Sequence, residues 1–129
     1  MAKEYTNEFQ VDFGADGQKL LPVVTQDAQS KEVLILAFVN QQAFEETLQS
    51  GYATFWSRSR NELWKKGETS GDMLRIQEIR VNCEQNSFLY LVTPEGDGAC
   101  HAKRENGKAH TSCYYRKVED NGLLRFIEK

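Results

Sequence analysis

The longest apolar run in the chain is VLILAFV at residues 33–39. It is rich in β-branched side chains and much shorter than the roughly 18 apolar residues that cross a bilayer, so it predicts a buried strand and no membrane partner. A second strand-like run, at 18–27, is separated from 31–40 by a short polar stretch. Together the two runs predict a β-hairpin near the start of a sheet.

One segment carries the signals of a helix. Asn40 stands at an N-cap position, residues 41–49 place apolar side chains at helical spacing, and Gly51 follows as a C-terminal stop. We therefore predict a single α+β domain over residues 1–129, mostly antiparallel β with this one clear helix.

Further strands are expected in the rest of the chain, and a phase slip near Gln77 indicates a bulge in one of them. Residues 60–72 predict a loop with one helical turn, and 123–128 a terminal strand or helix. The additional strands are expected at 52–59, 73–83, 87–93 and 111–118.

Composition narrows the class of partner. A hydrophobic content of 40% and a charged content of 27% are typical of a globular domain, and the net charge of −3 argues against binding a nucleic-acid polymer. Two basic stretches, 58–66 and 102–110, suit a small anionic ligand better. The first ten residues do not resemble a signal peptide, so we expect a cytoplasmic location with reduced thiols.

The segment 57–71 concentrates the groups that bind phosphate: cations, hydroxyls, and glycines that let backbone N–H groups approach an anion. Two tryptophans nearby suit a nucleotide base, although core packing explains them equally well. The alternative for the whole segment is a solvated polar loop. The candidate phosphate-binding residues are Trp56, Ser57, Arg58, Ser59, Arg60, Lys66, Gly67, Thr69, Ser70 and Gly71.

Three cysteines, Cys83, Cys100 and Cys113, cannot all pair within one chain. Their spacing alone favours three buried thiols, because free cysteine is among the most buried residue types. The alternative is a zinc site with three protein ligands and one open position, which would lower the pKa of bound water. His101 and His110 lie in the same part of the sequence as the cysteines.

From about Val33 to Arg116 the chain resembles the phosphoribosyl-AMP cyclohydrolase family of histidine biosynthesis. The motifs that carry the resemblance are LILAFVNQQAFEETLQSG, FWSRSRNELWKKGETSG, ACH and SCYYR. The resemblance implies hydrolytic opening of the adenine ring of N1-(5-phosphoribosyl)-AMP. It also implies an intertwined homodimer in which Cys83, Cys100 and Cys113, drawn from both subunits, bind zinc. His101 or His110 would then transfer protons.

The family pattern D-C-D-x-D around the first cysteine implies a magnesium site, but this chain departs from it. Asn82, Glu84 and Asn86 stand at the three aspartate positions, and magnesium prefers anionic oxygens, so its binding here is doubtful. The segment between Cys100 and Cys113 is also longer than in the family. These departures leave two alternatives, a paralogue acting on another purine nucleotide and a non-enzymatic module that binds zinc or nucleotide.

Overall fold

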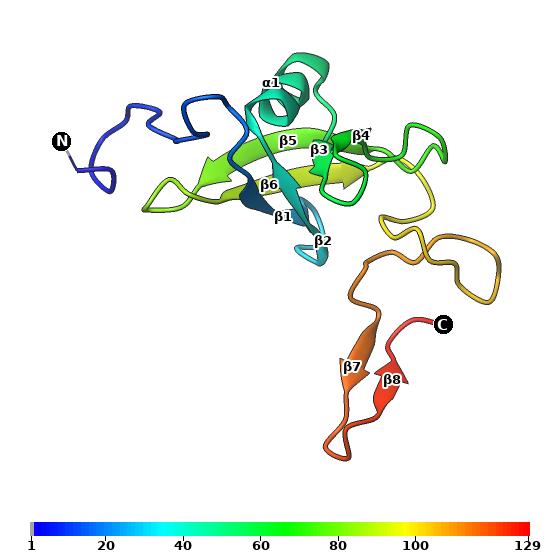
Figure 1. Cartoon of the computed structure of the whole chain (residues 1–129). Helices are drawn as coiled ribbons and strands as arrows, with labels where there is room; N and C mark the ends of the chain where they lie inside the picture. The colour runs from blue at the N-terminus through cyan, green and yellow to red at the C-terminus, as the bar shows by residue number, and fades with distance from the viewer. Residues whose placement is uncertain (1) are drawn as a thin grey trace.

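The computed structural model describes residues 2–129 (Figure 1). In this range the chain forms strands β1 to β8 and helix α1. Their bounds are β1 (Leu21–Asp27), β2 (Val33–Val39), α1 (Gln41–Ser50), β3 (Thr54–Ser57), β4 (Glu62–Lys65), β5 (Leu74–Val81), β6 (Phe88–Pro94), β7 (Arg116–Val118) and β8 (Leu124–Phe126).

A four-stranded sheet with the order β2-β1-β6-β5 forms the body. The predicted hairpin of β1 and β2 is confirmed, and β5 and β6 form a second antiparallel hairpin. The predicted bulge is confirmed too, because the register of β5 shifts between Ile76 and Glu78. The central pair, β1 and β6, is parallel. The sheet is therefore antiparallel everywhere except at its middle.

Helix α1 begins and ends where the sequence predicts. The Asn40 side chain accepts a hydrogen bond from the Ala43 N–H at 2.9 Å, and Gly51 closes the helix with φ 80°. The Thr47 hydroxyl accepts the Thr54 N–H at 3.0 Å, which fixes the start of β3 beside the helix. Within residues 2–129, no helix has the length and apolar character needed to span a bilayer.

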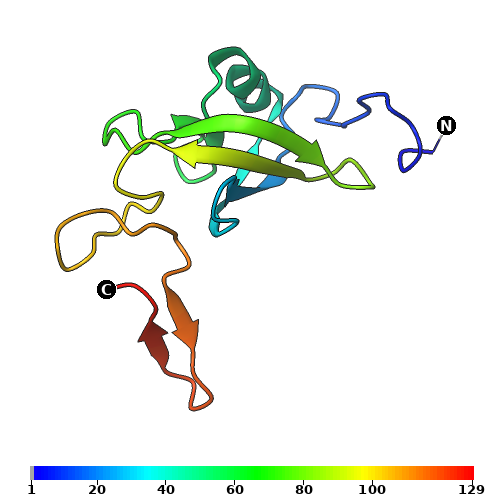
Figure 2. The same cartoon turned by 180° about the vertical axis from the view of Figure 1, so that it is seen from behind.

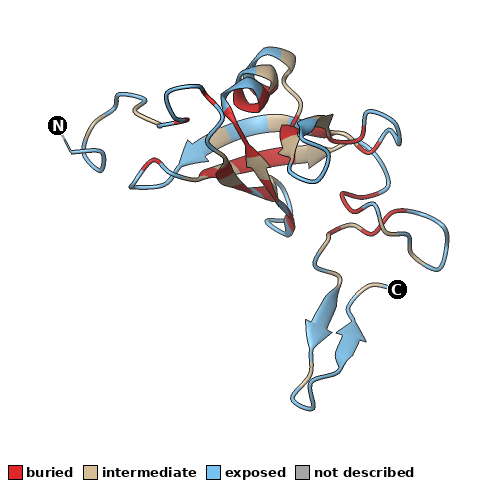
Figure 3. Cartoon of the chain, in the orientation of Figure 1, coloured by how far each residue is buried: buried red, intermediate tan, exposed pale blue. Residues whose placement is uncertain are grey.

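Aromatic side chains fill the core between α1 and the sheet. Phe44 of the helix stacks on Phe88 of β6 at 4.7 Å between ring centroids, and Phe13 joins them. Figure 3 shows that the buried residues follow the main sheet and the inner face of the helix. Burying each large apolar side chain contributes roughly 1.5–3 kcal/mol, so this layer holds the helix against the sheet.

The prediction of a loop with one helical turn over residues 60–72 was wrong in its first part. β4 pairs with β3 in a two-stranded hairpin, with Asn61 at φ 53° in the turn. The strand forms because Trp64 packs against Phe55 at 5.7 Å and Leu63 packs on the core. Charged residues flank Leu63 and Trp64 in the sequence, so the pattern of this segment does not indicate a strand.

The predicted strand at 111–118 is also shorter than expected. Only Arg116–Val118 forms a strand, because the residues before it bond to β2 instead: the Cys113 N–H donates to the Leu34 carbonyl at 2.8 Å and the Ser112 hydroxyl to the Val33 carbonyl at 2.7 Å. Of the two structures predicted for residues 123–128, a strand or a helix, the strand is confirmed as β8. The β7–β8 hairpin projects from the body in both views (Figures 1 and 2) and is exposed along both strands.

Candidate active site

A hollow of about 360 Å³ lies beside the β3–β4 hairpin, and we call it the loop hollow. It brings the turn after β4 together with the segment that follows Cys100. It contains five of the predicted phosphate-binding residues and one predicted catalytic histidine. The lining residues are Arg60, Glu62, Leu63, Trp64, Lys65, Lys66, Gly67, Glu68, Thr69, Ser70, Asp72, Cys100, His101 and Lys103.

The turn after β4 has a shape that only glycine permits at Gly67. Its φ is 82°, and a Cβ there would lie 2.2 Å from the carbonyl carbon of Asp72. The Gly71 N–H donates to the Gly67 carbonyl at 2.7 Å, and the Ser70 hydroxyl accepts the Asp72 N–H at 3.1 Å. The turn therefore closes on itself and leaves the exposed hydroxyl of Thr69 beside the hollow.

Lys66 is the buried cation of the loop hollow. Its ammonium donates to the Asp72 carbonyl at 3.2 Å. Burial lowers the pKa of Lys66, although the Asp72 carboxylate and the thiols of Cys113 and Cys100 oppose that effect. A phosphate placed beside this ammonium would stabilise its charged form, which burial disfavours, so the hollow favours binding of an anion.

The other predicted phosphate-binding residues lie elsewhere. Trp56, Ser57, Arg58 and Ser59 line a separate hollow of about 500 Å³ against β2, which we call the strand hollow. The Arg58 guanidinium lies 3.9 Å from the centre of the Phe38 ring. Gly71 lines neither hollow. The prediction of one continuous phosphate site is therefore corrected, because the β3–β4 hairpin divides the motif.

Trp64 lines both hollows. Two roles were predicted for the tryptophans from the sequence, contact with a nucleotide base and core packing. Trp64 is half-buried and packs partly against the core, so its packing role and its position at the site coexist. Lys103 also lines the loop hollow, as does Asp72, which was not predicted as a site residue. A signal for Asp72 was present in the sequence, since it ends the glycine-bearing turn.

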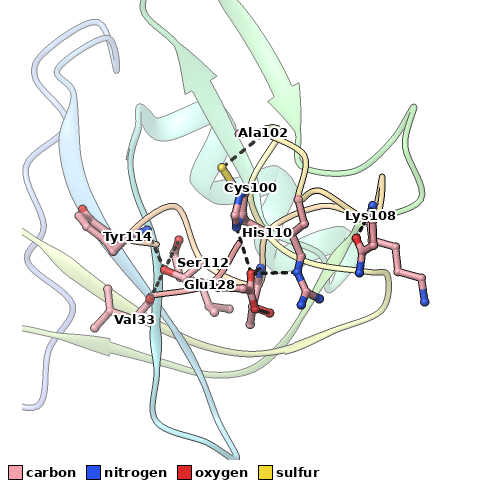
Figure 4. Close-up of polar contacts among 12 residues, drawn as sticks. Val33, Cys100, Ala102, Lys108, His110, Ser112, Tyr114 and Glu128 are labelled. Atoms are coloured by element: carbon pink, nitrogen blue, oxygen red, sulfur yellow. Dashed lines mark hydrogen bonds and ion pairs between the residues drawn. The ribbon is translucent and has the colours of Figure 1, made fainter. Parts of the chain in front are cut away.

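Two of the three cysteines lie together. The Cys100 N–H donates to the His110 carbonyl at 3.1 Å, and Ala102 donates its N–H to the Cys100 sulfur at 3.3 Å (Figure 4). Burial and the neighbouring Cys100 thiol together raise the pKa of Cys113 to about 12. This pair of thiols lies next to the loop hollow, to which Cys100 contributes.

Cys83 lies at the opposite end of the sheet. It is exposed in the turn after β5, whereas Cys100 follows the far end of β6. The seven residues of β6 span roughly 20 Å at about 3.3 Å per residue. Across residues 2–129, no cluster of three or more His, Cys, Asp or Glu side chains has the geometry to hold a metal. The three cysteines therefore do not meet within one chain.

The two histidines have different surroundings. His101 is exposed and lines the loop hollow. His110 is buried, stacks on Tyr115 at 3.6 Å between ring centroids, and places Nδ1 at 3.2 Å from a Glu128 carboxylate oxygen (Figure 4). Of the two catalytic candidates, only His101 lies where a substrate in the hollow would meet it.

Comparison with known proteins identifies the family. The family model described as phosphoribosyl-AMP cyclohydrolase matches residues 35–115. A phosphoribosyl-AMP cyclohydrolase of Archaeoglobus fulgidus is 49% identical over 104 residues, which cover 81% of this chain and 90% of the relative. One from Hyphomonas neptunium is 44% identical over 128 residues, covering 99% and 90%. A histidine biosynthesis bifunctional protein HisIE of Aquifex aeolicus is 42% identical over 102 residues, covering 79% and 47%. These matches span the main sheet, the helix and both segments that line the loop hollow. The chain therefore belongs to the phosphoribosyl-AMP cyclohydrolase family.

Proposed function

We propose that this protein hydrolyses N1-(5-phosphoribosyl)-AMP and opens its adenine ring, as a step of histidine biosynthesis. The observation that carries the proposal is the loop hollow, where cations and hydroxyls suited to a phosphate lie beside Cys100 and His101. Family membership supports the choice of substrate.

The reaction requires one water and one proton transfer. Water adds at C6 of the ring, and the bond between C6 and N1 breaks. C6 becomes a carboxamide carbon, while N1 keeps the bonding electrons and takes up a proton. We assign the proton transfer to His101, because an imidazole both accepts and donates a proton near neutral pH and this one lines the hollow.

Phosphate binding is assigned to the turn after β4. Lys66 supplies a fixed positive charge, and the exposed hydroxyls of Thr69 and Ser70 supply donors. A buried cation attracts an anion more strongly than an exposed one, because less water screens the pair. Trp64 at the edge of the hollow offers an apolar face to the purine base.

Zinc fits the residues only in part within one chain. Cys100 and Cys113 form a pair of adjacent sulfurs, whereas Cys83 is exposed at the other end of β6. A structural or catalytic zinc takes three or four ligands, so we infer that Cys83 of a second copy completes the set. When bound there, zinc would supply a Lewis acid that lowers the pKa of water.

A homodimer also accounts for the exposed apolar side chains of the C-terminal hairpin. Val118, Leu123 and Ile127 are 75%, 65% and 67% exposed in the single chain. A two-stranded hairpin that projects from the body is marginally stable alone, so we infer that it packs on the second copy. Measurement of the molar mass in solution, with and without zinc, tests this inference.

The deciding experiment for the activity is turnover of N1-(5-phosphoribosyl)-AMP by zinc-loaded protein, followed by ultraviolet absorbance. We expect turnover that falls sharply in Lys66→Met and in His101→Ala, and that changes little in the exposed control Lys108→Met. Absence of turnover in protein with confirmed zinc would refute the proposed activity.

Mixing two inactive variants tests whether zinc is shared between chains. Cys83→Ser and Cys100→Ser protomers are each expected to lack zinc and activity. Random exchange of protomers between the two variants makes half of all dimers mixed. Each mixed dimer has one intact site of its two, so about a quarter of wild-type activity should return. If one chain held the metal alone, mixing would restore nothing.

A second candidate function is ring hydrolysis of another purine nucleotide by a paralogue. Two observations favour it: the amides at positions 82 and 86, and the extended segment between Cys100 and Cys113. Zinc-loaded protein that is inactive on N1-(5-phosphoribosyl)-AMP but active on a different purine nucleotide would establish this alternative.

A further inference from the structure

The turn that carries Cys83 is closed by its own amide side chains. The Asn82 side-chain oxygen accepts the N–H groups of Asn86 at 2.8 Å and Ser87 at 3.0 Å. The Asn82 amide nitrogen donates to the side-chain oxygen of Asn86 at 2.6 Å. Because two backbone donors point at the Asn82 side chain, its oxygen must face them, and its nitrogen is left to reach Asn86.

Gln85 fastens the same turn to the N-terminal arm. It is 5% exposed and has φ 51°, so its side chain points inward from the tip of the turn. Its oxygen accepts the Gln10 N–H at 2.7 Å, and its nitrogen lies 3.3 Å from the Glu8 carbonyl and 3.4 Å from the Lys3 carbonyl. The arm and the turn together enclose a hollow of about 350 Å³ that Cys83 lines.

These donors do not suit magnesium. Magnesium requires oxygen ligands, anionic or neutral, in a near-octahedral arrangement. The Asn82 oxygen is already occupied, because it accepts two backbone N–H groups. The Asn86 oxygen already accepts a hydrogen bond, and the turn itself contributes one carboxylate, that of exposed Glu84. From the arm, Glu4 and Glu8 also line this hollow, but both are exposed and Glu8 already accepts a bond from Gln10. The family's magnesium positions therefore lack the charge and the free oxygens of a site.

A simple electrostatic difference explains why amides can replace the metal. Two carboxylates facing one another across a turn repel and need a cation between them. Two amides attract directly, because each has both a donor and an acceptor. The bond from Asn82 to Asn86 thus closes the turn with no net charge and no ion.

We propose that the amide network of Asn82, Asn86 and Gln85 replaces magnesium in this chain, so that the protein neither binds nor requires magnesium at the turn. In this role Asn82 and Gln85 are positioning residues that hold Cys83 where a second copy can use it. The second statement rests on the proposed function, since it takes Cys83 as a zinc ligand. The first does not, because it concerns the turn alone.

Magnesium response of the unfolding temperature tests the first statement, using zinc-free protein. The wild type and Asn86→Asp are expected to unfold at the same temperature with and without magnesium, since the single carboxylate still accepts the Asn82 bond. Asn82→Asp/Asn86→Asp is expected to unfold at a lower temperature without magnesium. At magnesium about 100-fold above Kd its midpoint should rise by roughly 8 °C. A rise of this size in the wild type, or no response in the double variant, overturns the proposal.

Zinc affinity tests the positioning role. Gln85→Ala is expected to weaken zinc binding about tenfold in competition with a chromophoric chelator, while Gln10→Ala, whose side chain bonds only to exposed Glu8, leaves it unchanged. Equal affinity for both variants overturns the positioning role. If Cys83→Ser binds zinc as tightly as the wild type, the shared zinc site has failed, while the magnesium result still stands on its own.

Discussion

The carboxylate of Glu128 connects the C-terminal tail to the segment that carries Cys100 and Cys113. One oxygen accepts the Thr111 N–H at 2.8 Å and lies 3.2 Å from His110 Nδ1, and the other accepts the Thr111 hydroxyl at 2.7 Å. Arg104 Nε lies 3.8 Å away. Figure 4 shows His110 beside Glu128. We predict that Glu128→Ala destabilises the protein more than replacement of any exposed carboxylate by alanine does.

The size of the effect follows from these contacts. A hydrogen bond to a charged group contributes about 1.5–3 kcal/mol when buried, and the Glu128 side chain is 26% exposed, so water replaces part of each bond. We take about 1 kcal/mol for each of the two Thr111 bonds, up to about 1 kcal/mol for the His110 contact, and little for Arg104 at its distance. The expected loss is about 2–3 kcal/mol. For a chain of this size that lowers the unfolding midpoint by roughly 8 °C.

Urea and thermal unfolding at equal protomer concentration measure the loss, and Glu119→Ala is the matched control. Glu119 makes a single ion pair, with Arg125 at 2.9 Å, and the Arg125 side chain is 64% exposed, so the pair should contribute at most about 1 kcal/mol. A double-mutant cycle with Thr111→Val should give a coupling of about 1 kcal/mol. The reasoning is refuted if the two glutamate variants agree within about 0.5 kcal/mol.

The pH dependence gives an independent check on the same carboxylate. Burial alone would raise the pKa of Glu128, but the Thr111 bonds, His110 and Arg104 outweigh it, so the pKa lies below its usual value. The contribution is therefore complete above the unfolded pKa of about 4.3 and is lost as the pH falls through the folded pKa. The stability difference between wild type and Glu128→Gln should shrink in that acidic range. A difference that grows there contradicts the assignment.

Three further substitutions test the packing that supports the site. Tyr90→Phe should cost less than about 0.5 kcal/mol or stabilise the fold, because the buried hydroxyl lacks a hydrogen-bond partner among the described residues; urea unfolding measures this. Gly98→Ala should cost more than about 2 kcal/mol and reduce zinc content, because its Cβ would lie 2.1 Å from the His110 carbonyl oxygen. Asn40→Ala should cost about 1–2 kcal/mol through loss of the Ala43 cap, with most of it regained in Asn40→Ser.

Local signals in the sequence were enough to predict much of the fold. The helix between Asn40 and Gly51, the first hairpin and the bulge in β5 each depend on residues a few positions apart. β4 was missed because Trp64 is half-buried among lysines and a glutamate, so no alternation is visible. The strand predicted at 111–118 came out short because the backbone groups of its first residues bond to β2 and to Glu128, both distant in the sequence.

The candidate site was predictable by residue type but not by arrangement. Composition grouped the arginines and serines after Trp56 with the glycine-bearing turn after β4, because they are neighbours in the sequence. A hairpin turn between them sends Arg58 and Lys66 to different hollows. Likewise, His101 and His110 were equivalent candidates in the sequence. In the structure the Cys100 N–H bonds to the His110 carbonyl, and the His110 imidazole stacks on Tyr115.

The cysteines show most clearly what sequence spacing cannot decide. A single strand, β6, lies between Cys83 and Cys100, and a strand keeps its two ends apart. Zinc holds each thiolate at about 2.3 Å, whereas β6 spans roughly 20 Å, so no change of side-chain rotamer brings the two sulfurs to one metal. Any zinc site that uses all three cysteines must therefore combine two chains. In the dimer proposed above, the exposure of Cys83, the adjacency of Cys100 and Cys113, and the exposed apolar side chains of the C-terminal hairpin would all follow from one assembly.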